Sequence, residues 1–456
     1  MRWRRDARRA GIRVGRMRAV GLLAASLISL AGCAAPGSPG TSVGPHFVTP
    51  PLIHYTSVLW PVPLQLVGAE PGSRLRLVAT MPTPQGEWSS GATYTVPASG
   101  VLDLASARPQ LAAFSRPDSA GLFWSLQGPR LGIAQQIGLW AHSVAGVTID
   151  AWQGARIVAS RLFRLDGLGL ASRPSAVFAS DLVGAAKSAG DRAPQLAASD
   201  PLSFGTRADA TVGDFYSASS PERPRTPAVL VFDDDSMGAS SDFIAPLLVE
   251  FGASVLVLPS GGAATGAQTV SVIDASAVSA ALDWLASRPD IDRRDIFFYG
   301  TGQAEQFALW SAVRYRDRVA GAFGAGGSTT LLCLPDGNVS AAFEGGVGVP
   351  CQADAGVVRQ AAVFALNEVR GPLVLGCGGH DEVLFNACRW LDAAVSARGA
   401  RAGDSIVRAS AAAHPISVPP GLPIDLGDPA TAEATEQARI AFWNAVARIL
   451  LTAATS

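Results

Sequence analysis

The sequence predicts two architectures in series: an N-terminal antiparallel β-sandwich (Ig-like) and a C-terminal α/β domain with a mostly parallel sheet. The chain has 456 residues, a length typical of two or three domains. Hydrophobic residues make up 48% and charged residues 16%, so large cores can be buried. Short alternating segments precede residue 168, whereas continuous apolar runs separated by helical stretches follow residue 227.

The composition also excludes several classes of protein. The apolar content is too high for a disordered chain, and the composition is neither collagenous nor that of a coiled coil. The formal net charge is -1, and no basic stripe occurs outside the N-terminus, so we expect no nucleic-acid partner. The sequence has no CxxC motif and no Cys/His cluster. We therefore predict no metal and no cofactor.

The first 32 residues have the pattern of a lipoprotein signal peptide. Residues 1–18 contain eight arginines, and the apolar run that follows, Ala19–Ala31, is too short to span a membrane comfortably. It ends in Leu-Ala-Gly-Cys33, which resembles the bacterial lipobox, where cleavage precedes a lipid-bearing cysteine. We predict a signal peptide over 1–32, a flexible tether over 33–48, and lipid anchoring through Cys33 on the extracytoplasmic side of the cell membrane. The alternative is an ordinary signal peptide or a short anchor.

Alternating polar and apolar residues predict the β-sandwich over residues 49–168. Proline, glycine and serine separate these period-two segments, as in antiparallel sandwiches. The predicted strands include Ser73–Ala79, Ala92–Val96, Gly138–Val144 and Ala155–Leu162.

Residues 169–456 are predicted to form the α/β domain. Residues 170–226 read as a connection with early strands. Buried strands that alternate with helices indicate a parallel sheet covered on both faces. The strand candidates are Ala228–Phe232, Ser254–Leu258, Asp295–Tyr299, Gly371–Leu375 and Ser405–Val407, and the helical stretches include Val272–Ser287 and Gln303–Arg316.

Four cysteines remain in the mature chain besides Cys33: Cys333, Cys351, Cys377 and Cys388. An even number in an exported protein suggests disulfides, and four cysteines allow three pairings. We favour local pairing, Cys333 with Cys351 and Cys377 with Cys388. Buried free thiols are the alternative.

A strand, a sharp turn and a helix occur in succession around Gly300-Thr301-Gly302-Gln303-Ala304. This is the layout of the nucleophile elbow of α/β-hydrolases, with Gly302 at the nucleophile position and the backbone N–H of Gln303 as an oxyanion donor. In such domains the acid and then the histidine follow along the chain. Asp381 comes after the strand at 371–375, and His414 comes after the strand at 405–407. We therefore predict Asp381 and His414 as the partners, with His380 as a neighbour of the site.

Taken together, these features resemble the acyl-CoA thioesterase / bile acid-CoA:amino acid N-acyltransferase (BAAT) family. Gly121–Leu126 is similar to a Gly-Leu-Phe-Trp-Ser stretch of the family's N-terminal domain, Asn367–Leu373 to the approach to its acid strand, and Phe442-Trp443 to its closing helix. The resemblance implies an N-terminal sandwich, a C-terminal α/β-hydrolase domain and acyl chemistry through a serine or cysteine nucleophile.

Two features depart from this family. Gly302 has no side chain to attack an acyl group. The run Asp233–Asp235 follows the first strand of the hydrolase core, where relatives are glycine-rich, and its charge would disfavour an oxyanion or a polyphosphate. This run reads as a solvated loop that caps a helix, with a divalent-cation site as the alternative.

Three functions remain compatible with the sequence. The first is a pseudoenzyme that keeps an acyl pocket and binds an acyl or lipid small molecule. The second is an active ester or thioester hydrolase with a non-standard nucleophile or a water activated by His414. The third is a structural or adhesive envelope lipoprotein. We favour the first, because fold alone does not establish activity and the nucleophile is missing.

Overall fold

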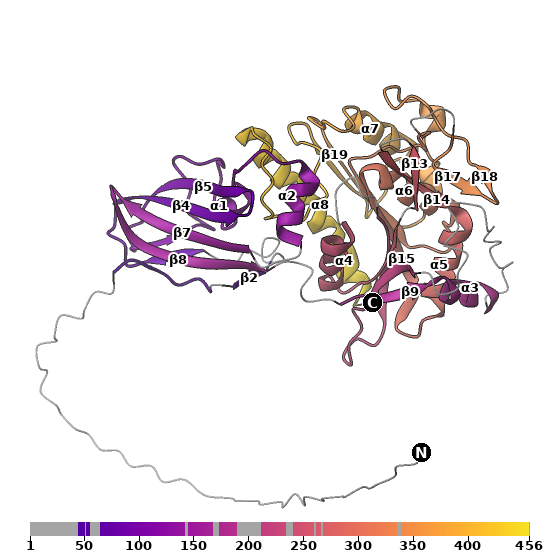
Figure 1. The fold of residues 1–456 in the computed structure, drawn as a ribbon, viewed down its shortest axis with the longest axis horizontal. Coiled ribbons are helices and arrows are strands. Elements are labelled where there is room, and N and C mark those ends of the chain that lie inside the picture. The colour runs from indigo at the N-terminus through magenta and orange to yellow at the C-terminus, as the bar shows by residue number, and fades with distance from the viewer. Residues whose placement is uncertain are drawn as a thin grey trace, which may run out of the picture. The chain divides into compact units, whose positions relative to one another are not determined.

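The computed structural model describes residues 44–50, 52–54, 64–141, 145–166, 173–188, 211–233, 240–259, 261–265, 268–334 and 339–455 (Figure 1). The predicted signal peptide, Cys33, Asp234 and Asp235 lie outside the described residues. Val43–Ser456 forms one compact unit. No helix within the described ranges is long and apolar enough to cross a membrane.

Two sheets make up the N-terminal part, and they confirm the predicted sandwich. One has the order β2 (Leu52–His54), β8 (Arg156–Asp166), β7 (Ala145–Gln153), β4 (Arg74–Thr83) and β5 (Gly86–Thr95). The other has the order β1 (His46–Phe47), β3 (Gln65–Val67) and β6 (Val101–Asp103). The pairs are antiparallel except β2 with β8. Alternate residues of β4 are buried, as the period-two pattern predicts.

The folded part begins earlier than the sequence suggested. The tether was predicted to extend to residue 48, but His46 and Phe47 form β1. Phe47 is buried, and its ring packs edge-on against Phe163 of β8, with centroids 5.6 Å apart. An aromatic side chain buried between the two sheets ties this segment to the sandwich.

The strand predicted over Gly138–Val144 is wrong in its first half. Residues 138–141 belong to helix α2 (Ile133–Ala141), and residues 142–144 are not described. Gln136 is buried in this helix, where its amide donates to the carbonyl of Leu131 (2.9 Å) and accepts from the N–H of Asp425 (2.7 Å). The alternation of residues in a short segment does not show a hydrogen bond to a residue as distant as Asp425. We attribute the helix at this position to such contacts. A second short helix, α1 (Gly121–Trp124), contains the family-like Gly-Leu-Phe-Trp stretch.

An eight-stranded, mostly parallel sheet forms the C-terminal part and confirms the predicted α/β-hydrolase domain. Among the strands of this sheet, β10 runs in the opposite direction to the other seven, because it pairs antiparallel with both β12 and β9. The order is β20 (Ser405–Ala409), β19 (Leu373–Gly378), β16 (Gly321–Ala325), β15 (Ile291–Thr301), β11 (Thr226–Asp233), β12 (Ser254–Pro259), β10 (Thr211–Tyr216) and β9 (Ser175–Phe178).

Helices cover both faces of this sheet. Val229 and Val231 of β11 pack with α4 (Ser240–Glu250) and α8 (Pro429–Ala453). Leu230 and Phe232 point to the other face. The helices on that face are α3 (Ala179–Ser188), α5 (Ala275–Ser287), α6 (Glu305–Arg314) and α7 (Ala387–Arg398). Burial on both faces explains why the strands read as continuous apolar runs.

A smaller four-stranded sheet contains β13 (Gly261–Thr265), β14 (Gln268–Asp274), β17 (Ala342–Glu344) and β18 (Val347–Gly348). The helix predicted from Val272 begins instead after Asp274, whose carboxylate accepts from the N–H of Ser276 (2.7 Å) and caps α5. Residues 272–274 are therefore the end of a strand.

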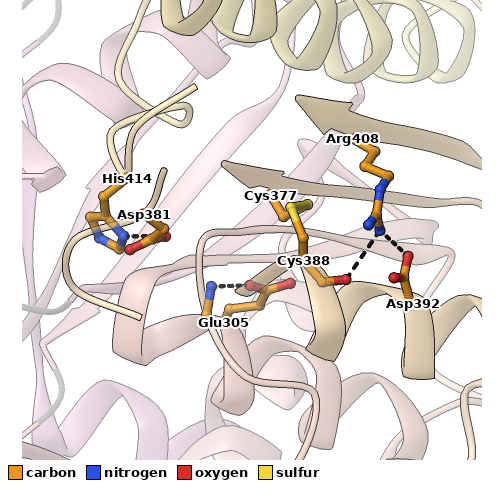
Figure 2. Close-up of a disulfide and its surroundings, with 8 residues drawn as sticks. Glu305, Cys377, Asp381, Cys388, Asp392, Arg408 and His414 are labelled. Atoms are coloured by element: carbon orange, nitrogen blue, oxygen red, sulfur yellow. Dashed lines mark hydrogen bonds and ion pairs between the residues drawn. A yellow bond between two sulfur atoms is a disulfide. The ribbon is translucent and has the colours of Figure 1, made fainter. Parts of the chain in front are cut away.

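Both predicted disulfides are present. Cys333 is bonded to Cys351, and Cys377 is bonded to Cys388. The second bond joins the end of β19 to α7 and closes the loop that carries Asp381 (Figure 2).

Candidate active site

The turn after β15 has the geometry of a nucleophile elbow. Thr301 ends the strand in an extended conformation, Gly302 has φ +57°, and a 3-10 turn over Gly302–Ala304 leads into α6. Glycine adopts this left-handed conformation without the steric cost that a side chain brings. A Cβ at Gly300 would lie 2.2 Å from the carbonyl oxygen of Ala304, so the turn can close only with glycine there. Gly302 thus stands at the apex, without a side chain.

Asp381 lies in the loop after β19 and is buried. Its Oδ1 accepts the backbone N–H groups of Val383 (2.9 Å) and Leu384 (2.7 Å). These two bonds orient the carboxylate and leave Oδ2 for a third donor.

His414 is that donor. Its Nδ1 lies 2.8 Å from Oδ2 of Asp381, and both side chains are buried (Figure 2). Because a carboxylate oxygen only accepts, Nδ1 is the donor of this pair, and in a neutral ring Nε2 is then the acceptor nitrogen. The structure therefore brings together the two partners that the sequence predicted, and the imidazole has the tautomer that a general base requires.

Two glycines allow the acid loop and the histidine loop to meet. A Cβ at Gly378 would lie 2.3 Å from the carbonyl oxygen of Ala413, and a Cβ at Gly379 would lie 2.2 Å from that of Ser410. The loops are joined by two backbone hydrogen bonds, from Gly379 N to Ala409 O and from His380 N to Ala412 O, each 2.9 Å. The side chain of His380 is exposed, and its Nδ1 lies 3.5 Å from Oγ1 of Thr431.

The turn after β16 connects the elbow with the histidine. A Cβ at Gly326 would lie 3.3 Å from Cε1 of His414, and a Cβ at Gly327 would lie 2.1 Å from the carbonyl oxygen of Gly302. These two consecutive residues therefore touch the imidazole on one side and the elbow on the other.

Sequence reasoning missed Glu305. This residue begins α6, is only 2% exposed, and accepts the N–H of Gly327 at 2.5 Å (Figure 2). Burial raises the pKa of Glu305 to about 8; the Gly327 N–H opposes this shift, and the charge of Asp381 adds to it. The available signal was the one carboxyl group in the stretch from Gly300 to Arg314, three residues after the apex and at the start of a helix.

The remaining predicted residues lie at the carboxyl edge of the sheet or beside the elbow. Gln303 follows Gly302 in the 3-10 turn, and its side chain is exposed. Asp233 is the last residue of β11. The roles assigned to the Gln303 N–H and to the aspartate run stay predictions.

Comparisons with known proteins agree with the N-terminal part of the resemblance. Residues 60–138 match the family model described as the Acyl-CoA thioester hydrolase/BAAT N-terminal region. The match lies within the predicted sandwich. No match was found among curated proteins.

Solved structures with similarity to the chain include hydrolases of low identity. Dienelactone hydrolase from Anabaena variabilis is 15% identical, with a TM-score of 0.33 over 59% of this chain and 96% of that one. An esterase from the archaeon Pyrobaculum calidifontis is 15% identical, with a TM-score of 0.35 over 54% of this chain and 82% of that one. The fold assignment rests on the strand order and the elbow described above.

Proposed function

We propose that this chain, an α/β-hydrolase-fold protein with an acyl-CoA thioester hydrolase/BAAT N-terminal region, binds an acyl or lipid ligand and has lost covalent acyl transfer. One observation carries the loss of acyl transfer: the buried Asp381–His414 pair is connected by the Gly326–Gly327 turn to an elbow whose apex, Gly302 at φ +57°, has no side chain. The acyl or lipid ligand is inferred from the family resemblance of the N-terminal region. A covalent acyl-enzyme needs an attacking oxygen or sulfur, and this position offers neither.

Thr301 does not replace the missing group. Its backbone is extended (φ −135°, ψ 158°) and it lies in β15, one residue before the sharp turn. Successive side chains of a strand point to opposite faces, so its hydroxyl is not displayed where an apex side chain would stand. A hydrolase acting through Thr301 is therefore disfavoured.

The acid–histidine pair supports a second candidate, hydrolysis by activated water. The Nδ1 hydrogen bond to Asp381 holds His414 in the tautomer whose Nε2 can accept a proton from water. Such an enzyme would turn over esters slowly, without an acyl-enzyme.

Ligand capture and pre-steady-state kinetics test the proposal together. Native mass spectrometry of the purified protein is expected to show a co-purifying acyl or lipid adduct, and p-nitrophenyl esters are expected to give no burst. Steady hydrolysis that disappears in His414→Ala would instead support activated water. A stoichiometric burst of p-nitrophenol, or a ligand-free protein in native mass spectra, would contradict the proposal.

The ligand is expected to come from the cell envelope. The proposed anchor at Cys33 places the mature chain outside the cytoplasm, where coenzyme A is scarce, so an envelope ester or lipid is the better candidate. The acidic run Asp233–Asp235, whose first residue is the last of β11, points the same way, because its charge would repel a polyphosphate.

Metabolic labelling tests the anchor. Cells grown with an alkyne fatty acid are expected to label the wild-type chain and not Cys33→Ala, which should appear in the soluble fraction. Cys388→Ala is a matched control that removes a different cysteine and should keep the label. Equal labelling of wild type and Cys33→Ala would refute lipidation at this residue.

A further inference from the structure

We propose that Glu305 is a positioning residue, which holds the Gly326–Gly327 turn and thereby sets the place of the His414 imidazole relative to residue 302. The inference rests on the proposed function only in its activity test. The structural part concerns a buried carboxyl group that neither the elbow motif nor the acid–histidine pair includes.

The fold reserves space for this carboxyl group. A Cβ at Gly324 would lie 2.7 Å from Cγ of Glu305, and a Cβ at Gly327 would lie 2.9 Å from Oε2. The two glycines therefore border the glutamate side chain, which fills the gap between β16 and the start of α6. Any larger residue at either position would displace it.

The hydrogen bond from Gly327 links Glu305 to the Gly326–Gly327 turn. Oε2 of Glu305 accepts the N–H of Gly327 (2.5 Å), and the preceding residue, Gly326, donates its N–H to Gly376 O (3.0 Å). The turn is thus held from α6 on one side and from β19 on the other. An unmade bond at this depth would leave a buried N–H without an acceptor, which is unfavourable.

The Gly326–Gly327 turn contacts both parts of the site, the histidine and the elbow. Gly326 has φ +71° and its Cα faces the ring of His414, while the Cα of Gly327 faces the carbonyl of Gly302. A shift of this turn would therefore change the separation between Nε2 and the apex. Misplacement of about 1 Å in an active site can reduce a rate by roughly 10²-fold.

The inference is tested by ring-nitrogen NMR of the full mature chain labelled with ¹⁵N-histidine. The His414 signals are assigned by comparison with His414→Asn. Glu305→Gln keeps a carbonyl acceptor for Gly327, so the Nδ1 proton should exchange as in the wild type. Glu305→Ala removes the acceptor, and exchange of that proton should quicken by about tenfold or more.

Leu309→Ala is the matched control. Leu309 lies one helical turn further along α6 and is fully buried, but it has no bond to the Gly326–Gly327 turn. Truncation of Leu309 also leaves a cavity beside α6, but the Glu305 carboxyl group still accepts the N–H of Gly327. The inference fails if Glu305→Ala leaves the Nδ1 proton unchanged, if Leu309→Ala has the same effect, or if Glu305→Gln perturbs the proton as strongly as Glu305→Ala.

An activity test uses the Gly302→Ser background. Glu305→Ala is expected to lower serine-dependent esterase activity by about 10²-fold, and Glu305→Gln to retain most of it. Loss of activity in both variants with an unchanged Nδ1 proton would overturn the positioning role. If Gly302→Ser restores no activity, the site has lost more than its nucleophile, and the NMR experiment still decides the role of Glu305.

Discussion

Gly302→Ser is expected to show esterase activity about 10²–10⁴-fold above that of the wild type. The serine hydroxyl would stand at the apex of the elbow, which the Gly326–Gly327 turn connects with His414, and the Nδ1 of this histidine is already bonded to Asp381. Activity is measured with short p-nitrophenyl esters, and a burst equal to the enzyme concentration would mark the acyl-enzyme. The variant should be less stable by about 1–3 kcal/mol, because a residue with a Cβ must adopt φ near +57°.

Two variants control for this result. Gly302→Ala introduces the same Cβ without a hydroxyl and should stay inactive. Gly302→Ser combined with His414→Ala should lose most of the gain, because the serine then has no base. High wild-type activity that survives His414→Ala would mean that the chemistry takes place at another site.

Raising the pH from 4.5 to 9 is expected to lower the free energy of unfolding, in part through Glu305. The pKa of Glu305 is raised by burial to about 8 in the folded chain, against 4.5 for the free side chain. Between these values the folded state keeps a proton that the unfolded state releases, so its stabilising effect is complete below pH 4.5 and is lost as the pH rises through 8. The loss amounts to about 3–5 kcal/mol.

Urea unfolding at several pH values checks this. Glu305→Gln should have a flatter pH dependence than the wild type, since glutamine stays neutral throughout. Glu436, buried and with a pKa raised to about 7, continues to contribute in both proteins. Glu368→Gln, at an exposed ion pair with Arg316, is the surface control and should keep the wild-type slope. Parallel curves for the wild type and Glu305→Gln would show that Glu305 does not hold this proton.

Local patterns determined much of the fold. The alternation in β4 and the apolar runs of β11, β12, β15 and β19 reflect burial on one face or on both faces, which a short segment expresses by itself. Where the local pattern was ambiguous, contacts between residues far apart along the chain determined the structure. Residues 138–141 are helical in α2, whose buried Gln136 accepts the backbone N–H of Asp425. Phe47 belongs to the sandwich because its ring packs against Phe163.

The order of chemical groups along the chain was also sufficient to predict that Asp381 and His414 lie together and that Gly302 lies in the turn after β15, because parallel strands end at the same edge of a sheet and carry their loops to one place. The sequence could not show that Glu305 belongs with them. The role of Glu305 depends on the close approach of Gly324 and Gly327, which lie about twenty residues further along the chain. These glycines become neighbours of Glu305 only when β16 pairs with β15. A carboxyl group acquires a raised pKa and a fixed partner from the packing around it, and that environment exists only in the tertiary structure.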